Sequence, residues 1–460
     1  MKIFVLGNGF DLACGWNSTF FAFFEDIWKK NRKNKLLNQK NFSDWFKDIL
    51  EKAKCCYERK WGFYCFLLNH LIDAFLPHLD FENYSSEQMN NFINNGTIIL
   101  SIFCLLLEIN HYFKNLGVGL NEYENNFKNI KWLDIENDLK ELSIQENENS
   151  LQKILSKIID DVDITQKQLQ QKGLRKEDVI FDDLRWLNDF CNDERFSSTE
   201  KINKLLIGWV DKFEKDFNNF LYDQTINILP FWECLSKNQA EIYSKLLIKS
   251  DVKSSELIKI INFNYTYQYL FKHENNEDHL TIEYLFSTDK SFSQVNEKKI
   301  SFLPMSYIHG GIHNPRLNGP QCIIGFNDLR LNNKVDELTK TFKLNTYASL
   351  HNDSDNDDEK FYALNLPILK ADEYIDLIFF GHSLGENDWP YFYEIFNKYD
   401  LNSEKNSNVN KIYFFFCESL YSQQVAQNVM SKRIKKMFDE YFKKNTDIWR
   451  RNKVIMDFKF

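Results

Sequence analysis

Proline and paired cysteines are both scarce in this chain. Only seven of its 460 residues are proline, which leaves long stretches that helices can occupy without interruption. The nine cysteines are scattered along the chain, with Cys55 and Cys56 adjacent, and no two of them are spaced as CxxC. This pattern excludes a zinc ribbon and a disulfide framework, and it indicates reduced thiols in a reducing compartment. We therefore expect a cytoplasmic protein rich in helices.

The chain also lacks a membrane segment and an excess of basic residues. Its longest apolar run, residues 98–107, is broken by Ser101 and falls short of the roughly 18 residues that a transmembrane helix needs. The first apolar run ends in glycine after four residues, unlike a signal peptide. A net charge of -9 argues against general binding to nucleic acid or anionic lipid. We expect neither as a partner.

Phenylalanine, in contrast, is abundant, with 42 residues. Between residues 21 and 256 apolar residues recur at three- and four-residue spacing, which is typical of helices packed on one another. The longest such stripe comprises Ile202, Leu205, Leu206, Trp209, Phe213, Phe217 and Phe220. The sequence therefore predicts a large all-helical insertion over residues 21–256, with a role in sensing or assembly.

The chain begins with a strand pattern that runs directly into a glycine loop. The apolar run of residues 3–6 precedes Gly7 and Gly9, and a helix pattern that Asn17 or Ser18 could cap follows. A loop between a strand and a helix can point backbone N–H groups at an anionic ligand. The glycine spacing differs from the dinucleotide fingerprint, so a purely structural turn remains an equal alternative.

After residue 256 short apolar runs replace the helical spacing. Runs of strand length are LIKIINF, TIEYLF, SYIHGG, QCIIGF, YIDLIFFG and KIYFFFC. Polar residues follow them at their C-terminal ends, which is the edge of an open α/β sheet where ligands bind. We therefore predict an α/β fold. A Rossmann-like, doubly wound parallel sheet would be formed by residues 1–20 and 257–460, with the helical insertion after the first strand and helix.

Three features at predicted strand ends could carry chemistry. Asn264 in FNYT and His309 in IHGG each close a strand, although alone they fit a turn residue and a packed side chain. GHSLG at 381–385 matches a serine-hydrolase elbow, but that fold needs a histidine after Ser383, and no histidine follows His382. Ser383 is better interpreted as a hydroxyl that binds a ligand. Together these residues predict an uncharged polar cleft.

Several motifs, in this order, resemble the AbiH family of bacterial phage abortive-infection proteins. They are GNGFDLA at the start, WLDIE at 132–136, FNYT, IHG and GHSLGENDWPYF. The resemblance implies antiphage defence, a phage-derived trigger and possible assembly into a homo-oligomer. Asp134 and Glu136 of WLDIE either enter the cleft or pair with basic neighbours on a helix surface.

The same order of motifs is similar to the sirtuin-like NAD-binding fold. The nucleotide-binding residues that this resemblance implies are Gly7, Asn8, Gly9, Asp11, Gly381, Ser383 and Asp388. The first loop would lie along the phosphates and adjoining ribose, and Ser383 with Asp388 would hold the adenosine side. The loop reads GNGFD rather than GAG followed by serine, and the zinc ribbon is missing. These departures argue against a peptide deacylase.

The resemblance also implies two catalytic residues and no metal. Asn264 would orient the nicotinamide ribose or a water molecule, and His309 would be the general base. Cleavage of the nicotinamide–ribose bond needs little acid assistance, because nicotinamide is a good leaving group. Our leading hypothesis is a triggered NAD glycohydrolase, with NAD as substrate and no prosthetic group. The alternatives are a non-catalytic sensor of NAD or ADP-ribose and, less favoured, a metal-dependent nuclease.

Overall fold

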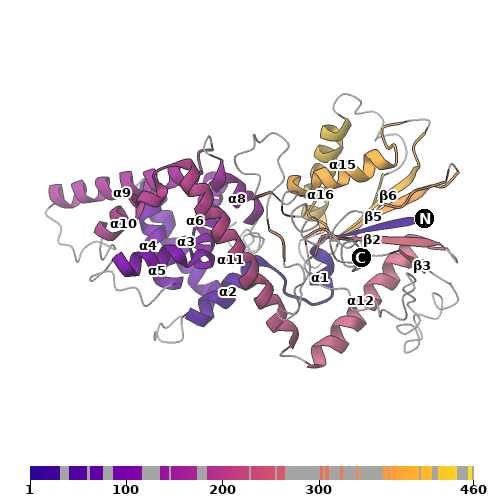
Figure 1. The fold of residues 1–460 in the computed structure, drawn as a ribbon, viewed down its shortest axis with the longest axis horizontal. Coiled ribbons are helices and arrows are strands. Elements are labelled where there is room, and N and C mark those ends of the chain that lie inside the picture. The colour runs from indigo at the N-terminus through magenta and orange to yellow at the C-terminus, as the bar shows by residue number, and fades with distance from the viewer. Residues whose placement is uncertain are drawn as a thin grey trace, which may run out of the picture.

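The structure consists of a layer of helices beside a parallel β-sheet (Figure 1). It is a computed structural model. It describes residues 1–31, 41–59, 63–75, 86–116, 135–144, 147–172, 184–226, 229–253, 256–264, 301–303, 306–309, 322–324, 338–339, 343, 366–370, 372–403, 406–416, 423–442 and 454–457.

The helical layer is formed by the elements from α2 to α11. They are α2 (Phe20–Asn31), α3 (Phe42–Arg59), α4 (Phe63–Phe75), α5 (Ser86–Asn94), α6 (Gly96–Leu116), α8 (Ile135–Ser143), α9 (Leu151–Lys172), α10 (Leu184–Cys191), η3 (Glu194–Phe196) and α11 (Thr199–Ile226). The elements of the sheet region are β1 (Lys2–Leu6), α1 (Gly9–Ala13), α12 (Leu229–Lys249), β2 (Leu257–Asn262), β3 (Ser301–Phe302), β4 (Ser306–Tyr307), β5 (Ile375–Phe380), η8 (Glu386–Asp388), α15 (Trp389–Lys398), β6 (Val409–Phe415), α16 (Gln423–Phe442) and β7 (Val454–Asp457).

The strands run in the order β3-β2-β1-β5-β6-β7, with β4 also pairing with β2. Each pairing between them is parallel. β1 is central, so that Lys2 lies opposite Ile258 on one side and Asp376 on the other. The predicted α/β class with a parallel sheet is therefore confirmed.

Helices cover both faces of the sheet. Side chains along β1 point alternately to the two faces and all five are buried, so each face needs a covering layer. Ile3 and Val5 belong to the core that includes α15 and α16, whereas Phe4 and Leu6 belong to the core that includes α1 and α12. The helices lie on opposite sides of the sheet in Figure 1. Strands buried on both faces read as continuous apolar runs, which is why the sequence revealed β1, β2, β5 and β6.

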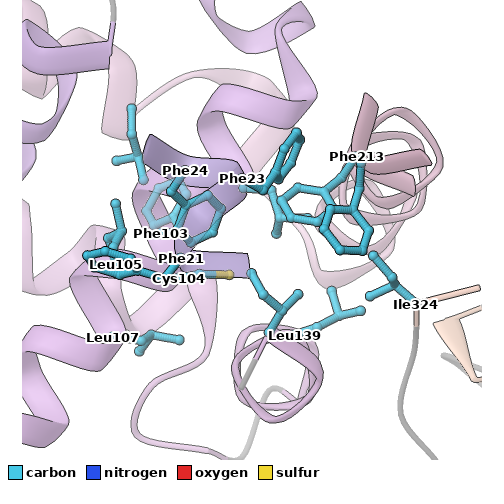
Figure 2. Packing of buried hydrophobic residues seen from close by; sticks show 14 of the residues in the cluster. Phe21, Phe23, Phe24, Phe103, Cys104, Leu105, Leu107, Leu139, Phe213 and Ile324 are labelled. Atoms are coloured by element: carbon cyan, nitrogen blue, oxygen red, sulfur yellow. The ribbon is translucent and has the colours of Figure 1, made fainter. Parts of the chain in front are cut away.

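The core of the helical layer mixes aliphatic side chains with many aromatic rings (Figure 2). Phe213 of α11 packs edge-on against Phe23 and Phe24 of α2, with centroids 5.1 and 6.1 Å apart. Trp209 donates its indole N–H to the carbonyl of Ile93, at 3.0 Å. The predicted stripe on α11 is confirmed as a packing face, because six of its seven residues are buried.

Some local predictions differ from the structure. α2 is capped by Thr19, whose Oγ1 accepts a hydrogen bond from the Ala22 amide at 3.1 Å, rather than by Asn17 or Ser18. Residues 322–324 of QCIIGF form no strand, although the Ile323 amide donates to the His309 carbonyl. TIEYLF lies outside the described residues.

α12 has a distinct place in this arrangement. The sequence predicts an α/β domain of residues 1–20 and 257–460 and a helical insertion of residues 21–256. This division puts α12 in the insertion. In the structure Tyr243 of α12 packs against Phe10 of α1, with ring centroids 5.1 Å apart. The Lys249 ammonium lies over the Phe415 ring. This helix therefore covers the sheet, and the exact division into domains stays a prediction.

Two further predictions from composition can be compared with the described residues. The described cysteines Cys14, Cys104, Cys191 and Cys322 are buried free thiols, as expected for reduced cysteines. None of the described helices combines the length and the apolar character that crossing a bilayer requires.

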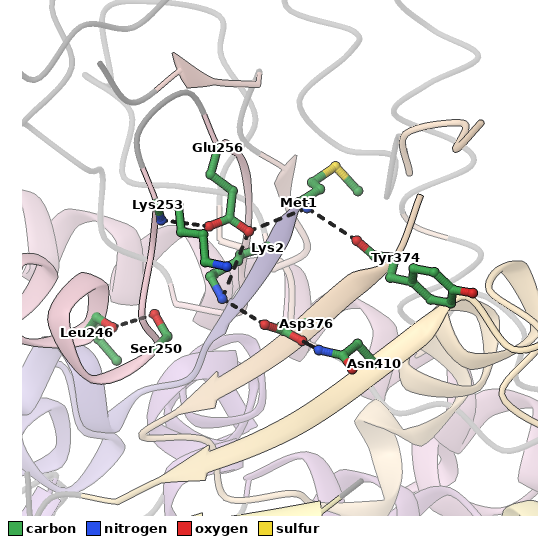
Figure 3. Close-up of polar contacts among 9 residues, drawn as sticks. All are labelled: Met1, Lys2, Leu246, Ser250, Lys253, Glu256, Tyr374, Asp376 and Asn410. Atoms are coloured by element: carbon green, nitrogen blue, oxygen red, sulfur yellow. Dashed lines mark hydrogen bonds and ion pairs between the residues drawn. The ribbon is translucent and has the colours of Figure 1, made fainter. Parts of the chain in front are cut away.

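A polar cluster fixes the N-terminal edge of the sheet, where β1 and β5 begin (Figure 3). The Lys2 ammonium lies 2.7 Å from the Asp376 carboxylate, and Asn410 donates to the same carboxylate at 2.9 Å. Glu256 lies 3.5 Å from the amino group of Met1 and accepts from the Lys253 amide. These contacts connect β1, β5 and β6 at the edge opposite the candidate site.

Lys259, in the middle of β2, gives a prediction about stability. It is 1% exposed, and burial lowers the pKa of its ammonium to about 8 from 10.5. Between these values the unfolded chain binds more protons, so stability should rise with pH from about 8 to 10.5. Lys259→Met should remove the desolvation cost and raise the free energy of unfolding at pH 7 by about 2 kcal/mol, measured by urea denaturation.

Lys2→Met on the neighbouring strand is the matched control. Its ammonium pairs with Asp376, so the substitution leaves a partly buried carboxylate without its partner and should lower stability. A lower urea midpoint for Lys259→Met as well would contradict the prediction.

Candidate functional site

The candidate site lies where the C-terminal ends of four parallel strands meet. β1 leads into Gly7, β2 into Asn264, β4 into His309 and β5 into Gly381. Because parallel strands end at a common edge, the fold brings these predicted residues to one side of the sheet.

The two glycine loops at this edge cross backbone to backbone. The Gly7 amide donates to the Phe380 carbonyl at 2.9 Å, and the Gly9 amide donates to the Gly381 carbonyl at 2.7 Å. A Cβ atom on Gly7 would lie 2.3 Å from the Cα of His382, and one on Gly9 would lie 2.7 Å from the Cα of Gly381. Gly7 and Gly9 are therefore required by close approach of two loops.

Three backbone donors of the first loop are already engaged inside the protein. Besides the two glycine amides, the Phe10 amide donates to the Gly7 carbonyl at 2.8 Å. The Asn8 Oδ1 atom accepts from the Ser18 hydroxyl at 2.7 Å, and Asp11 is 1% exposed. The helix that follows has only five residues. A phosphate-binding role for this loop stays a prediction, and it would require some of these hydrogen bonds to change.

The structure brings two histidines to one carboxylate. Nε2 of His309 lies 3.2 Å from Oδ1 of Asp388, and Nε2 of His382 lies 3.7 Å from Oδ2. Nδ1 of His382 accepts a hydrogen bond from the Leu384 amide at 2.9 Å, so a neutral His382 carries its proton on Nε2. Asp388 is therefore positioned to orient His309, whereas His382 lies beyond hydrogen-bond distance of the carboxylate. The resemblance implied a role for Asp388 at the adenosine side, which also stays a prediction.

Phe263 packs against both imidazoles. Its ring meets that of His309 and that of His382 edge-on, with centroids 5.4 and 4.9 Å apart. His309, His382 and Asp388 are each less than a tenth exposed. An apolar ring packed against buried polar groups restricts their rotation, and a fixed imidazole is what proton transfer requires.

Asn264 lies at the same level of the sheet as His309. Asn262 pairs with Tyr307, and Asn264 and His309 each follow two residues later. Asn264 is 1% exposed, and within the described part of the chain neither its side-chain oxygen nor its nitrogen has a hydrogen-bond partner. A buried unpaired amide costs about 1–3 kcal/mol. Such an amide at a strand end points to a polar ligand.

Ser383 differs from a hydrolase nucleophile. It is exposed, and its carbonyl accepts from the Arg433 guanidinium at 2.9 Å. The non-glycine residue of GHSLG with positive φ is Leu384, at 55°, rather than the serine. The ring nitrogens of the adjacent His382 face Leu384 and Asp388. Because both ring nitrogens face other groups, His382 is poorly oriented to take a proton from the Ser383 hydroxyl.

The helical layer reaches this site through α8, which lies on the side facing the sheet (Figure 1). Asn387, next to Asp388, donates to the Asn137 side chain at 3.2 Å. Glu136 is half-buried, with its Oε1 atom shielded from solvent. Asp134 lies outside the described residues. The helix that carries the end of WLDIE therefore contacts a loop of the site.

A second connection runs from α11. Glu214 accepts from the Ile324 amide and from the Lys343 ammonium, each at 2.6 Å. The neighbouring Ile323 amide donates to the His309 carbonyl at 2.8 Å. His309 is thus held on one side by Asp388 and on the other by a segment anchored to the helical layer.

Sequence reasoning missed His382, Phe263 and the pairing of Asp388 with His309. A signal existed for His382, which stands inside GHSLG at the end of a strong strand pattern. The pairing had no such signal, because His309 and Asp388 are 79 residues apart.

Comparison with known proteins agrees with the order of motifs. A family model described as bacteriophage abortive infection AbiH matches residues 3–411. This span contains the candidate residues from Gly7 to Asp388. No curated protein and no solved structure matches the chain.

Proposed function

Since the chain belongs to the AbiH family of bacteriophage abortive-infection proteins, which implies a role in phage defence, we propose that it is a triggered NAD glycohydrolase. It would cleave NAD to nicotinamide and ADP-ribose. The observation that carries the proposal is the buried amide of Asn264, which has no hydrogen-bond partner among the described residues and lies at the same edge as the His309–Asp388 pair.

The strand order supports a nucleotide-binding core. With β3 and β4 counted as one position, the sheet has the order 3-2-1-4-5-6. Rossmann-type dinucleotide-binding sheets use this order and bind their ligand at the point where it reverses, outside the C-terminal ends of the strands. Here that point lies between β1 and β5, where the two glycine loops cross. The order supports a Rossmann-like, sirtuin-like interpretation of the sheet.

The proposed reaction assigns a step to each residue. Asn264 orients the nicotinamide ribose or the attacking water, and His309 takes a proton from that water. The water oxygen bonds to the anomeric carbon as the bond to the pyridinium nitrogen breaks, so nicotinamide leaves as a neutral molecule. Asp388 positions His309 and stabilises its protonated form. General-base assistance of this kind contributes about 100- to 10,000-fold.

The burial of the site supports a closed resting state. His309 and Asp388 are 6% and 7% exposed, and the loop amides bond to carbonyls of the protein. An NADase without restraint would kill its own host, so activity must await infection. We infer that the trigger separates the glycine loops and admits NAD, through the contacts that α8 and α11 make with the site.

The test is NAD consumption by the purified full-length protein, alone and with lysate of phage-infected cells. We expect release of nicotinamide in the presence of lysate, and a rate lower by about 100-fold or more for His309→Ala. His70→Ala is the matched control, because His70 lies on α4 and bonds to the Phe66 carbonyl of the same helix. It should retain the wild-type rate.

A sensor of NAD or ADP-ribose is the second candidate. The observation that favours it is the same burial of His309 and Asp388, which limits the access of water. Intact NAD in every condition, together with saturable binding of labelled NAD or ADP-ribose, would replace hydrolysis by sensing. If the protein neither binds nor consumes NAD in any condition, both the hydrolase and the sensor proposals are overturned.

A further inference from the structure

Three metal-binding side chains converge inside the helical layer, away from the strand ends. Glu108 and His111 lie one turn apart on α6, and Asp138 lies on α8. One ligand atom from each can be chosen so that all lie within 4.8 Å of one another. An ion bound about 2.1 Å from each donor atom would hold these atoms roughly 3–4 Å apart. Small side-chain rotations are therefore enough to bring the three donors to coordination distance.

Burial makes a cation favourable at this position. Asp138 is 1% exposed, and Glu108 and His111 are partly buried. Two carboxylates that are close together and poorly hydrated repel each other unless a positive charge intervenes.

The surroundings of His111 resemble those of a metal-ligating imidazole. Its Nε2 lies 3.0 Å from the Glu141 carboxylate, and Asn149 donates to the same carboxylate oxygen at 2.6 Å. Asn149 Nδ2 also lies 3.2 Å from Nε2. In many metal sites a carboxylate accepts the N–H of the ligating histidine and thereby fixes its tautomer. With the proton on Nε2, the lone pair available to an ion is on Nδ1.

We propose that Glu108, His111 and Asp138 bind one divalent transition-metal ion, with Glu141 and Asn149 as supporting residues. The donor set of one imidazole and two carboxylates suits Zn²⁺, Mn²⁺ or Fe²⁺. It suits Cu⁺ poorly, because that ion prefers thiolates, and Ca²⁺ or Mg²⁺ poorly, because they prefer oxygen alone. Our sequence analysis expected no metal, because these ligands come from two helices whose approach only the fold reveals.

The test measures metal binding directly and is independent of any activity on NAD. Chelator-treated full-length protein is titrated with Zn²⁺ by calorimetry and with Mn²⁺ by electron paramagnetic resonance. We expect one ion per chain, and affinity weakened by at least about 10- to 100-fold in Asp138→Asn and in His111→Gln. Asp189→Asn, which changes an exposed carboxylate on α10 of the same layer, should bind like wild type.

Circular dichroism and thermal unfolding of the metal-free proteins show whether each variant folds. Zn²⁺ should raise the melting temperature of wild type but not that of Asp138→Asn, since binding to the folded state alone stabilises it. Absence of saturable binding of both ions to wild type would overturn the proposal. Equal affinity in wild type and in the folded His111→Gln variant would do the same, even if Asp138→Asn fails to fold.

Discussion

Gly7→Ala should yield little folded protein. The added methyl group would lie 2.3 Å from the Cα atom of His382 and 2.8 Å from the Gly381 carbonyl oxygen. Both obstacles are backbone atoms of the β5 loop, which cannot rotate away as a side chain would. Overpacking in a core costs about 1–3 kcal/mol, and a collision between backbones at the centre of a sheet should exceed about 4 kcal/mol. Soluble yield and thermal unfolding measure the effect.

Gly208→Ala is the control for this substitution. Gly208 lies inside α11, and a Cβ atom there would have no neighbour within 4 Å. Because alanine favours the helix over glycine, this variant should gain about 0.5–1 kcal/mol. Wild-type stability of Gly7→Ala would show that the loops separate easily, contrary to the close crossing. A Cβ atom on Gly9 would also collide with the Gly381 backbone. Loss of activity in a Gly9 variant would therefore reflect misfolding, and could not be assigned to loss of nucleotide binding.

Asp388→Asn should lower NAD hydrolysis by about 100-fold, no more than loss of His309 itself, with a much smaller effect on KM. This prediction rests on the proposed function. Asp388 contacts the Nε2 atoms of two histidines, and an amide there neither fixes the His309 tautomer nor stabilises its protonated form. Steady-state measurements of kcat and KM for nicotinamide release test it, with lysate as activator.

Two further variants separate positioning from a merely structural role. Asp376→Asn removes another sheet carboxylate at the opposite edge, so it should lower stability by breaking the pair with Lys2 while kcat is preserved. Asp388→Glu keeps the charge and should recover part of the rate. If Asp388→Asn melts earlier but turns NAD over at the wild-type kcat, Asp388 has no part in the reaction.

The sequence was sufficient for the elements whose burial leaves a pattern. β1, β2, β5 and β6 are mostly apolar runs of strand length, and the α11 stripe follows the helical period, so both could be predicted from spacing. The cap of α2 could not be assigned among three adjacent polar residues, because hydrogen-bond geometry rather than residue type selects Thr19.

The candidate site was predictable only in part. Asn264 and His309 were recognised because each ends a strand pattern. Their environment was not, since the carboxylate at His309 comes from η8 and the ring that packs against both histidines is Phe263, just after β2. The Glu108, His111 and Asp138 cluster was invisible for the same reason, because side chains on separate helices become neighbours only after packing.

The central place of β1 also determines the order in which the chain can fold. β1 leaves the ribosome before the other strands of the sheet, yet it must wait for the segments that carry Ile258 and Asp376 to be synthesised before either neighbouring strand can pair with it. The helices between them make contacts at shorter separation and can assemble during translation. The nascent chain should therefore carry an exposed apolar N-terminal strand for most of its synthesis, which makes it a natural client for chaperones that bind such segments.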